Sequence, residues 1–157
     1  MKMNKTAKSI QVSFILLLAL LSSSSILAHS GATGVVKDRM DAMSEMALAM
    51  KSMALIVKGK HQVNPLTFIQ GGELIARHSH KAPDLFPIGS IQGTSEALPI
   101  IWQQWDDFVN LSLRTKTDAK KLAKMAQEGS ELRPLTQQFV KLASDCKACH
   151  KDYRKKK

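Results

Sequence analysis

The last twelve residues of the chain read Cys146-Lys147-Ala148-Cys149-His150-Lys151-Asp152-Tyr153-Arg154-Lys155-Lys156-Lys157, and they contain the spacing Cys-x-x-Cys-His. On a helix, residues three and four positions apart share a face, so Cys146, Cys149 and His150 would project together. This is the attachment pattern of a c-type haem, in which both thiols form thioether bonds and the imidazole binds the iron as its fifth ligand. The stretch therefore predicts one covalent haem c per chain.

Other sites built on a cysteine pair fit less well. A structural zinc site needs four Cys or His ligands, and the chain has only two cysteines. A thioredoxin-like redox pair needs a surrounding βαβ pattern, which the sequence lacks. A disulfide between Cys146 and Cys149 stays open for a chain without haem.

Residues 1–28 have the pattern of a secretory signal peptide. Three lysines precede an apolar run at residues 12–21, and the segment ends at Ala28, a suitable cleavage position. The run is shorter than the roughly 20 residues of a membrane-spanning helix, although an uncleaved anchor stays open. Haem is attached to Cys-x-x-Cys-His outside the bacterial cytoplasm, so we expect a periplasmic domain at residues 29–157 without stable membrane insertion.

The composition limits the kinds of partner. The formal net charge is +10, and it falls to about +7 when the three signal lysines are removed. A basic surface can bind nucleic acid or anionic membrane, but in an exported haem protein we expect it to attract an acidic redox partner and not nucleic acid. The 129 residues that follow the signal suffice for one domain.

Apolar residues recur at helical spacing in four segments, with no convincing period-two stretch. The predicted helices cover residues 34–58, 65–80 and 99–128, and a fourth runs from residues 130–134 into the haem motif. Residues 115–118 are a possible break in the third helix. Residues 81–96 form a predicted loop, in which Leu85, Phe86 and Ile88 would fold inward over the core. The pattern predicts an all-α, antiparallel four-helix bundle with haem near the C-terminus.

The chain resembles the cytochrome c′ family, the class II c-type cytochromes, and in particular its low-spin cytochrome c-556 branch. The resemblance rests on the C-terminal haem motif through Arg154, on Arg39 with Met43, and on three shorter matches: Leu85-Phe86-Pro87, Ile101-Trp102 and Asp106-Asp107-Phe108. It implies an exported four-helix bundle, commonly a homodimer, so a homodimer is a further expectation.

The resemblance also implies roles for individual residues. The residue four positions after the first-helix arginine faces the iron, which makes Met43 the expected sixth ligand. Met46 and then Met40 remain competitors, because methionine also fills irregular cores. Arg39 is expected near a haem propionate. Arg154 is expected near the proximal imidazole, one helical turn after His150.

Three functions follow from these alternatives. The leading one is a periplasmic electron carrier with His150 and Met43 as axial ligands, since His/Met ligation saturates the iron. The alternative is a high-spin cytochrome c′ that binds nitric oxide or carbon monoxide at an open sixth site. Peroxidase-like catalysis would need a distal acid–base residue, and the methionines and alanines of the first helix supply none. We therefore expect no enzymatic activity.

Overall fold

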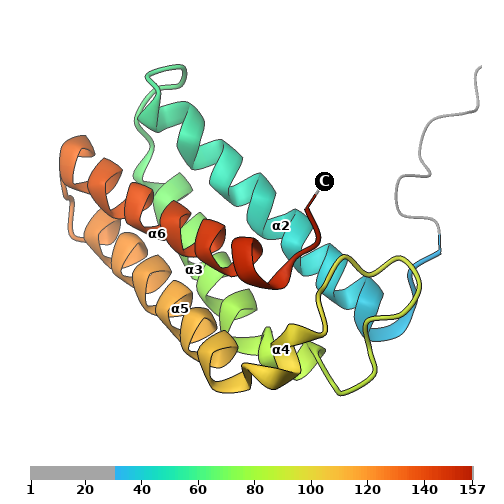
Figure 1. Ribbon diagram of the computed structural model, residues 1–157. Coiled ribbons are helices and arrows are strands. Elements are labelled where there is room, and N and C mark those ends of the chain that lie inside the picture. Colours follow the sequence, from blue (N-terminus) through green and yellow to red (C-terminus); the bar gives the residue numbers. More distant parts are fainter. Residues whose placement is uncertain (1–30, 157) are drawn as a thin grey trace, which may run out of the picture. The chain divides into compact units, whose positions relative to one another are not determined.

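The computed structural model describes residues 31–156, so the predicted signal peptide at residues 1–28 lies outside the described part. Figure 1 shows a bundle of four long helices: α2 (Gly34–Val57), α3 (Pro65–Lys81), α5 (Trp105–Gln127) and α6 (Leu132–Tyr153). A 3₁₀ turn, η1 (Pro83–Leu85), and the short helix α4 (Ile100–Gln103) lie between α3 and α5. The predicted four-helix bundle is confirmed.

Local signals explain where the helices begin and end. Asn64 accepts a hydrogen bond from the Leu66 amide at 3.0 Å and so caps α3, with Pro65 at its first position. Gly59 and Gly129 follow α2 and α5 with φ of 67° and 77°, which favours glycine after a helix. These boundaries agree with the sequence-based helices to within two residues.

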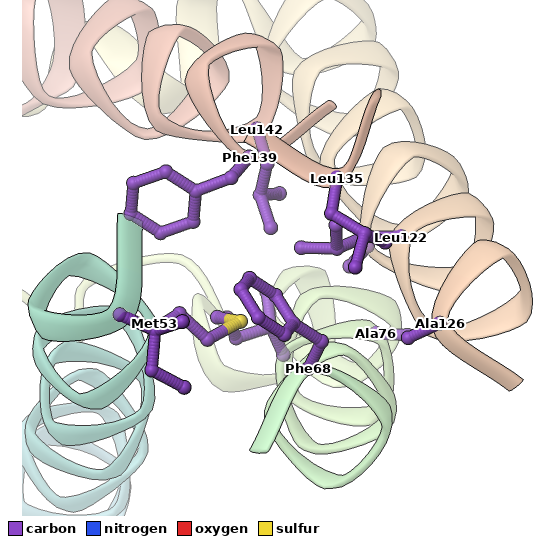
Figure 2. Close-up of a cluster of buried hydrophobic side chains, with 11 residues drawn as sticks. Met53, Phe68, Ala76, Leu122, Ala126, Leu135, Phe139 and Leu142 are labelled. Atoms are coloured by element: carbon purple, nitrogen blue, oxygen red, sulfur yellow. The ribbon is translucent and has the colours of Figure 1, made fainter. Parts of the chain in front are cut away.

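Most of the buried hydrophobic side chains form one main core between the four long helices (Figure 2). Its fully buried members include Met53 from α2, Phe68 and Ile75 from α3, Leu122 from α5 and Leu142 from α6. The α3–α5 and α5–α6 pairs are the most extensive, α2 packs mainly on α3, and α2 meets α6 over a narrow contact. The core therefore holds α3, α5 and α6 more tightly than α2.

Gly72 sets the close approach of α3 to α5. A Cβ built at this position would lie 2.7 Å from the carbonyl oxygen of Ala119 and 3.0 Å from the Ala123 Cβ. Only glycine leaves room for backbones at this separation. Gly72 therefore permits the close packing of α3 against α5.

The predicted break at residues 115–118 is wrong, because α5 runs through it. The hydroxyls of Thr115 and Thr117 donate to the carbonyls of Leu111 and Leu113 at 2.9 Å, which satisfies them inside the helix. The break falls earlier, at Gln104, whose φ of −118° and ψ of 42° separate α4 from α5.

Residues 82–99, which we call the crossover segment, connect α3 to α4. The expectation that its apolar residues fold inward holds for Phe86, which is buried, and fails for Ile88, which is 89% exposed. The Ser90 amide donates to the Pro87 carbonyl at 3.1 Å, and Gly89 has a φ of 83°. Ile88 therefore stands at the tip of a tight turn, where its side chain points away from the core.

Within residues 31–156 no helix is both long and apolar enough to cross a membrane.

Candidate haem site

The haem motif lies on the last two turns of α6. Cys146 and Cys149 are free thiols of intermediate burial, and His150 follows one residue later on the same helix. Helical geometry therefore presents all three groups on one side of α6, as the spacing predicted. Within residues 31–156 no group of three or more His, Cys, Asp or Glu side chains is arranged to hold a metal ion.

The protein surroundings keep both thiols protonated. Burial raises the pKa of Cys149 to about 11, and the charges of Cys146 and Asp152 add to the effect. Burial also raises the pKa of Cys146, with a further contribution from the neighbouring Asp145 carboxylate. A backbone hydrogen bond at Cys146 acts in the opposite direction but does not offset these effects. Two neutral thiols beside an imidazole are the groups that covalent haem attachment requires.

His150 is held in the form that binds a metal. Its side chain is exposed at the surface of α6, yet desolvation by the adjacent protein lowers its pKa. The positive charge of Arg154 lowers the pKa further, whereas Glu96 acts in the opposite direction. The imidazole is therefore neutral near pH 7, and neutral imidazole is the ligating form.

A second apolar group, which we call the aromatic cluster, flanks the haem motif. Its buried members are Phe86, Ile101, Phe108 and Tyr153, and Cys149 packs against them. The ring of Phe108 meets Phe86 at 4.9 Å and Tyr153 at 5.4 Å between centroids, both edge to face. An apolar wall of this kind beside the two thiols suits the face and edge of a porphyrin.

Arg39 is buried, at 6% exposure, where α2 meets the crossover segment. One guanidinium nitrogen, Nη1, donates to the Leu85 carbonyl and the Ser90 hydroxyl, each at 3.0 Å. The other, Nη2, donates to the Ser90 carbonyl and, at 3.4 Å, to the Ser95 hydroxyl. The guanidinium carbon also lies 4.5 Å from the centre of the Phe86 ring. Arg39 thus links α2 to the crossover segment, and its contact with a propionate stays a prediction.

Arg154 holds the other end of the crossover segment. It was expected one turn further along the α6 helix, but α6 ends at Tyr153 and Arg154 is extended, with φ −120° and ψ 140°. Its Nε donates to Glu96 at 2.8 Å, and it forms an antiparallel bridge with Ala97. Pairing with the crossover segment takes the backbone out of the helix. Although Arg154 lies outside the helix, its positive charge still adds to the effect of burial in lowering the pKa of His150.

The methionines of α2 divide into packed and unpacked ones. Met53 is fully buried, and Met46 and Met50 pack against the main core. The sulfur of Met46 lies 4.0 Å from the Ser79 hydroxyl of α3, so this side chain is turned toward α3. Met43 is 37% exposed and belongs to neither apolar cluster. It lies one helical turn after Arg39.

Sequence reasoning missed the partners of the two arginines. Ser90 and Ser95 accept from Arg39, and Glu96 pairs with Arg154, across separations of 51 to 58 residues. No periodic pattern marks residues in such a loop. It also missed the buried pair Asp118 and Asp145 between α5 and α6, although both stand at core-facing positions of their helices.

The residues present fit a covalent haem. Two neutral thiols, a neutral imidazole and an apolar wall lie together at the end of α6, close to where the crossover segment meets α2. When bound, haem supplies a one-electron couple at its iron. The chain supplies the two cysteines for its attachment.

Comparisons with known proteins agree with this geometry. The family model described as Cytochrome C′ matches residues 34–154. A cytochrome c-556 from Agrobacterium tumefaciens is 32% identical over 124 residues, which cover 79% of this chain and 99% of that protein.

Solved structures show the same fold. Cytochrome c′ from Rhodopseudomonas palustris matches with a TM-score of 0.74 and 28% identity, covering 80% of this chain and 99% of that one. A nitric oxide complex of a mutant cytochrome c prime from Alcaligenes xylosoxidans matches with a TM-score of 0.70 and 30% identity, covering 78% and 94%. With its C-terminal cysteine pair and four-helix bundle, this chain belongs to the cytochrome c′ family, whose members bind haem c covalently and mainly carry electrons.

Proposed function

We propose that this protein is a periplasmic one-electron carrier in which Cys146 and Cys149 attach the haem and His150 and Met43 are the axial ligands. Two protein ligands saturate the iron, so substrates have no open position to bind. Oxidation and reduction then need little rearrangement around the metal, which favours electron transfer over catalysis. On this proposal the protein is not an enzyme.

The observation that carries this proposal is the different packing of the α2 methionines. The main core contains Met53, and Met46 and Met50 pack against it. Met43, in contrast, is 37% exposed. Met40 is turned by about 100° around the helix from Arg39, while Met43 lies one turn from it on nearly the same side. These two differences support Met43 as the thioether that reaches a haem held by α6.

The test replaces the thioether without changing the volume of the side chain. We expect Met43→Leu to abolish the sulfur-to-iron charge-transfer band of the oxidised protein and to allow carbon monoxide to bind the reduced protein. The matched control is Met46→Leu, which removes a sulfur from the same helix one turn later. The control should keep both wild-type properties. Loss of the band in Met46→Leu alone would make Met46 the ligand.

The alternative function is that of a gas-binding cytochrome c′ with an open sixth site. It is favoured by the matched Alcaligenes xylosoxidans protein, which is described as a nitric oxide complex. In that case the wild-type protein would be high-spin and would bind carbon monoxide at once, and Met43→Leu would change neither property. The spectra of the wild type and of this single variant therefore separate the two functions.

Location and partners complete the proposal. We infer that residues 1–28 direct export and are removed near Ala28, which the mass of the protein from a periplasmic fraction would test. The basic chain would then meet an acidic redox partner, so electron transfer between them should slow as ionic strength rises. A homodimer is also proposed, and sedimentation at micromolar concentration would reveal a monomer if the inference is wrong.

A further inference from the structure

The two halves of α2 are anchored in different ways. Every α2 residue that joins or borders the main core lies in the second half of the helix: Met46, Ala49, Met50, Met53, Ala54, Ile56 and Val57. In the first half, the buried residues are Arg39 and Ala42. Met43 belongs to this first half. Its position is therefore not set by the main core.

We propose that Arg39 is the positioning residue for the sixth haem ligand. By fixing the first half of α2 to the crossover segment, it holds Met43 at the separation from α6 that an iron–sulfur bond requires. This inference rests on the proposed function, in which Met43 binds the iron. It assigns Arg39 a role toward the protein instead of the expected contact with a propionate.

The contacts of Arg39 are suited to positioning. Four hydrogen bonds to three residues of the crossover segment fix the guanidinium plane in direction as well as in distance. The guanidinium also stacks on the Phe86 ring, and this contact restricts its movement further. A planar, five-donor fork can satisfy such a set, whereas a lysine ammonium or an amide cannot. One helical turn separates this fixed point from Met43.

The crossover segment is in turn fixed to the helices around the haem motif. Trp102 donates to the Phe86 carbonyl at 2.9 Å, and the Phe86 ring packs edge to face on Phe108 of α5. The Leu98 amide donates to the Tyr153 carbonyl at the end of α6, also at 2.9 Å. The direct contact between α2 and α6 is narrow, so the path through Arg39 is a second connection between the two helices.

The test removes the contact between Arg39 and the crossover segment in two ways, by changing the donor or by changing the acceptors. Arg39→Gln removes the fork, and Ser90→Ala combined with Ser95→Ala removes two of its acceptors while leaving the arginine in place. In each holoprotein we expect a weaker sulfur-to-iron band and carbon monoxide binding that is faster by about tenfold or more. Such a factor corresponds to the loss of one hydrogen bond to a charged group. If Arg39→Gln fails to fold, the double serine variant decides alone.

The matched control is Glu45→Gln. Glu45 lies two residues after Met43, and its carboxylate pairs with His78 of α3 at 2.7 Å, so the variant weakens α2 without touching the crossover segment. The control should keep the wild-type band. Equal loss of the band in this control would overturn the inference, because any loosening of α2 would then suffice.

Two further outcomes would also overturn it. A shifted reduction potential with an intact band in Arg39→Gln, and no effect in the serine variant, would make Arg39 a propionate partner instead. A wild-type protein without the band would overturn the proposed function together with this inference. An intact band in the wild type and in all variants would overturn the inference alone.

Discussion

At the residue scale, two buried carboxyl groups form a pair between α5 and α6. Asp118 and Asp145 are 3% and 4% exposed, and the Oδ2 atom of each has no hydrogen-bond partner among the other described groups. The Oδ1 atoms are satisfied by Lys141 at 2.9 Å and by Arg114 at 2.6 Å. Two ionised carboxylates cannot bond to each other, whereas a protonated one can donate to its neighbour. A proton on Asp145 would let this carboxyl donate a hydrogen bond to Asp118.

This pair predicts opposite effects for two isosteric substitutions. Burial and the neighbouring Asp118 raise the pKa of Asp145, so the stability gained from its protonation is complete at low pH and is lost as pH rises through the raised pKa. Burial favours a higher pKa for Asp118, but hydrogen bonds with Lys141, Asp145 and Gln138 together lower this pKa. The stability that Asp118 contributes is therefore lost as pH falls. Asp145→Asn should therefore increase stability near neutral pH, and Asp118→Asn should decrease it.

The measurement is the free energy of urea unfolding of the holoprotein as a function of pH. The advantage of Asp145→Asn over the wild type should shrink as pH falls toward the ordinary aspartate range, because the wild-type residue is then protonated too. Destabilisation by both variants at every pH would mean that the two carboxylates are both ionised and held only by Arg114 and Lys141.

At the element scale, Gly72 and Gly71 offer a matched pair of substitutions. Gly72→Ala would place its Cβ 2.7 Å from a backbone carbonyl of α5, so the helices must separate. We expect a loss of about 1–3 kcal/mol, which exceeds the gain of about 1 kcal/mol in helix propensity. Gly71→Ala meets only the flexible Met53 side chain, at 3.2 Å, and should cost less. Urea unfolding followed by circular dichroism measures both, and equal losses would contradict the close approach.

The helices could be predicted from the sequence because their signals are local. Periodicity, the Asn64 cap and the glycines after α2 and α5 each act within a few residues of the boundary that they set. The crossover segment could not be predicted in the same way. Its conformation depends on Arg39 of α2 and on Arg154, which follows α6, and each lies more than 50 residues away along the chain.

In the candidate site, too, the features that depend on local spacing could be predicted, and those that depend on tertiary packing could not. The spacing of Cys146, Cys149 and His150 sets their common face before any folding is considered. Periodicity alone does not distinguish Met43 from the other methionines of α2 as a candidate ligand. The packing of the main core was needed to distinguish them. The role of Arg39 depends on residues that no local pattern connects to it.

At the scale of the whole molecule, the uneven anchoring of α2 predicts a gradient in hydrogen exchange. Amides of residues 46–57 are backed by the main core, whereas those of residues 34–45 depend on Arg39, Ala42 and the proposed bond from Met43. Local opening of a helix costs less where fewer buried contacts are lost. We expect faster exchange in the first half of α2 than in the second.

Helix α5 is the internal control, since it is of nearly equal length and contributes to the aromatic cluster at one end and to the main core at the other. Its protection should be even along its central turns. In Met43→Leu the amides of residues 34–45 should lose further protection while those of α5 keep theirs, because only the former are tied to the iron. Uniform protection along α2 in the wild type, unchanged in this variant, would show that the first half of the helix is held by contacts other than Arg39 and Met43.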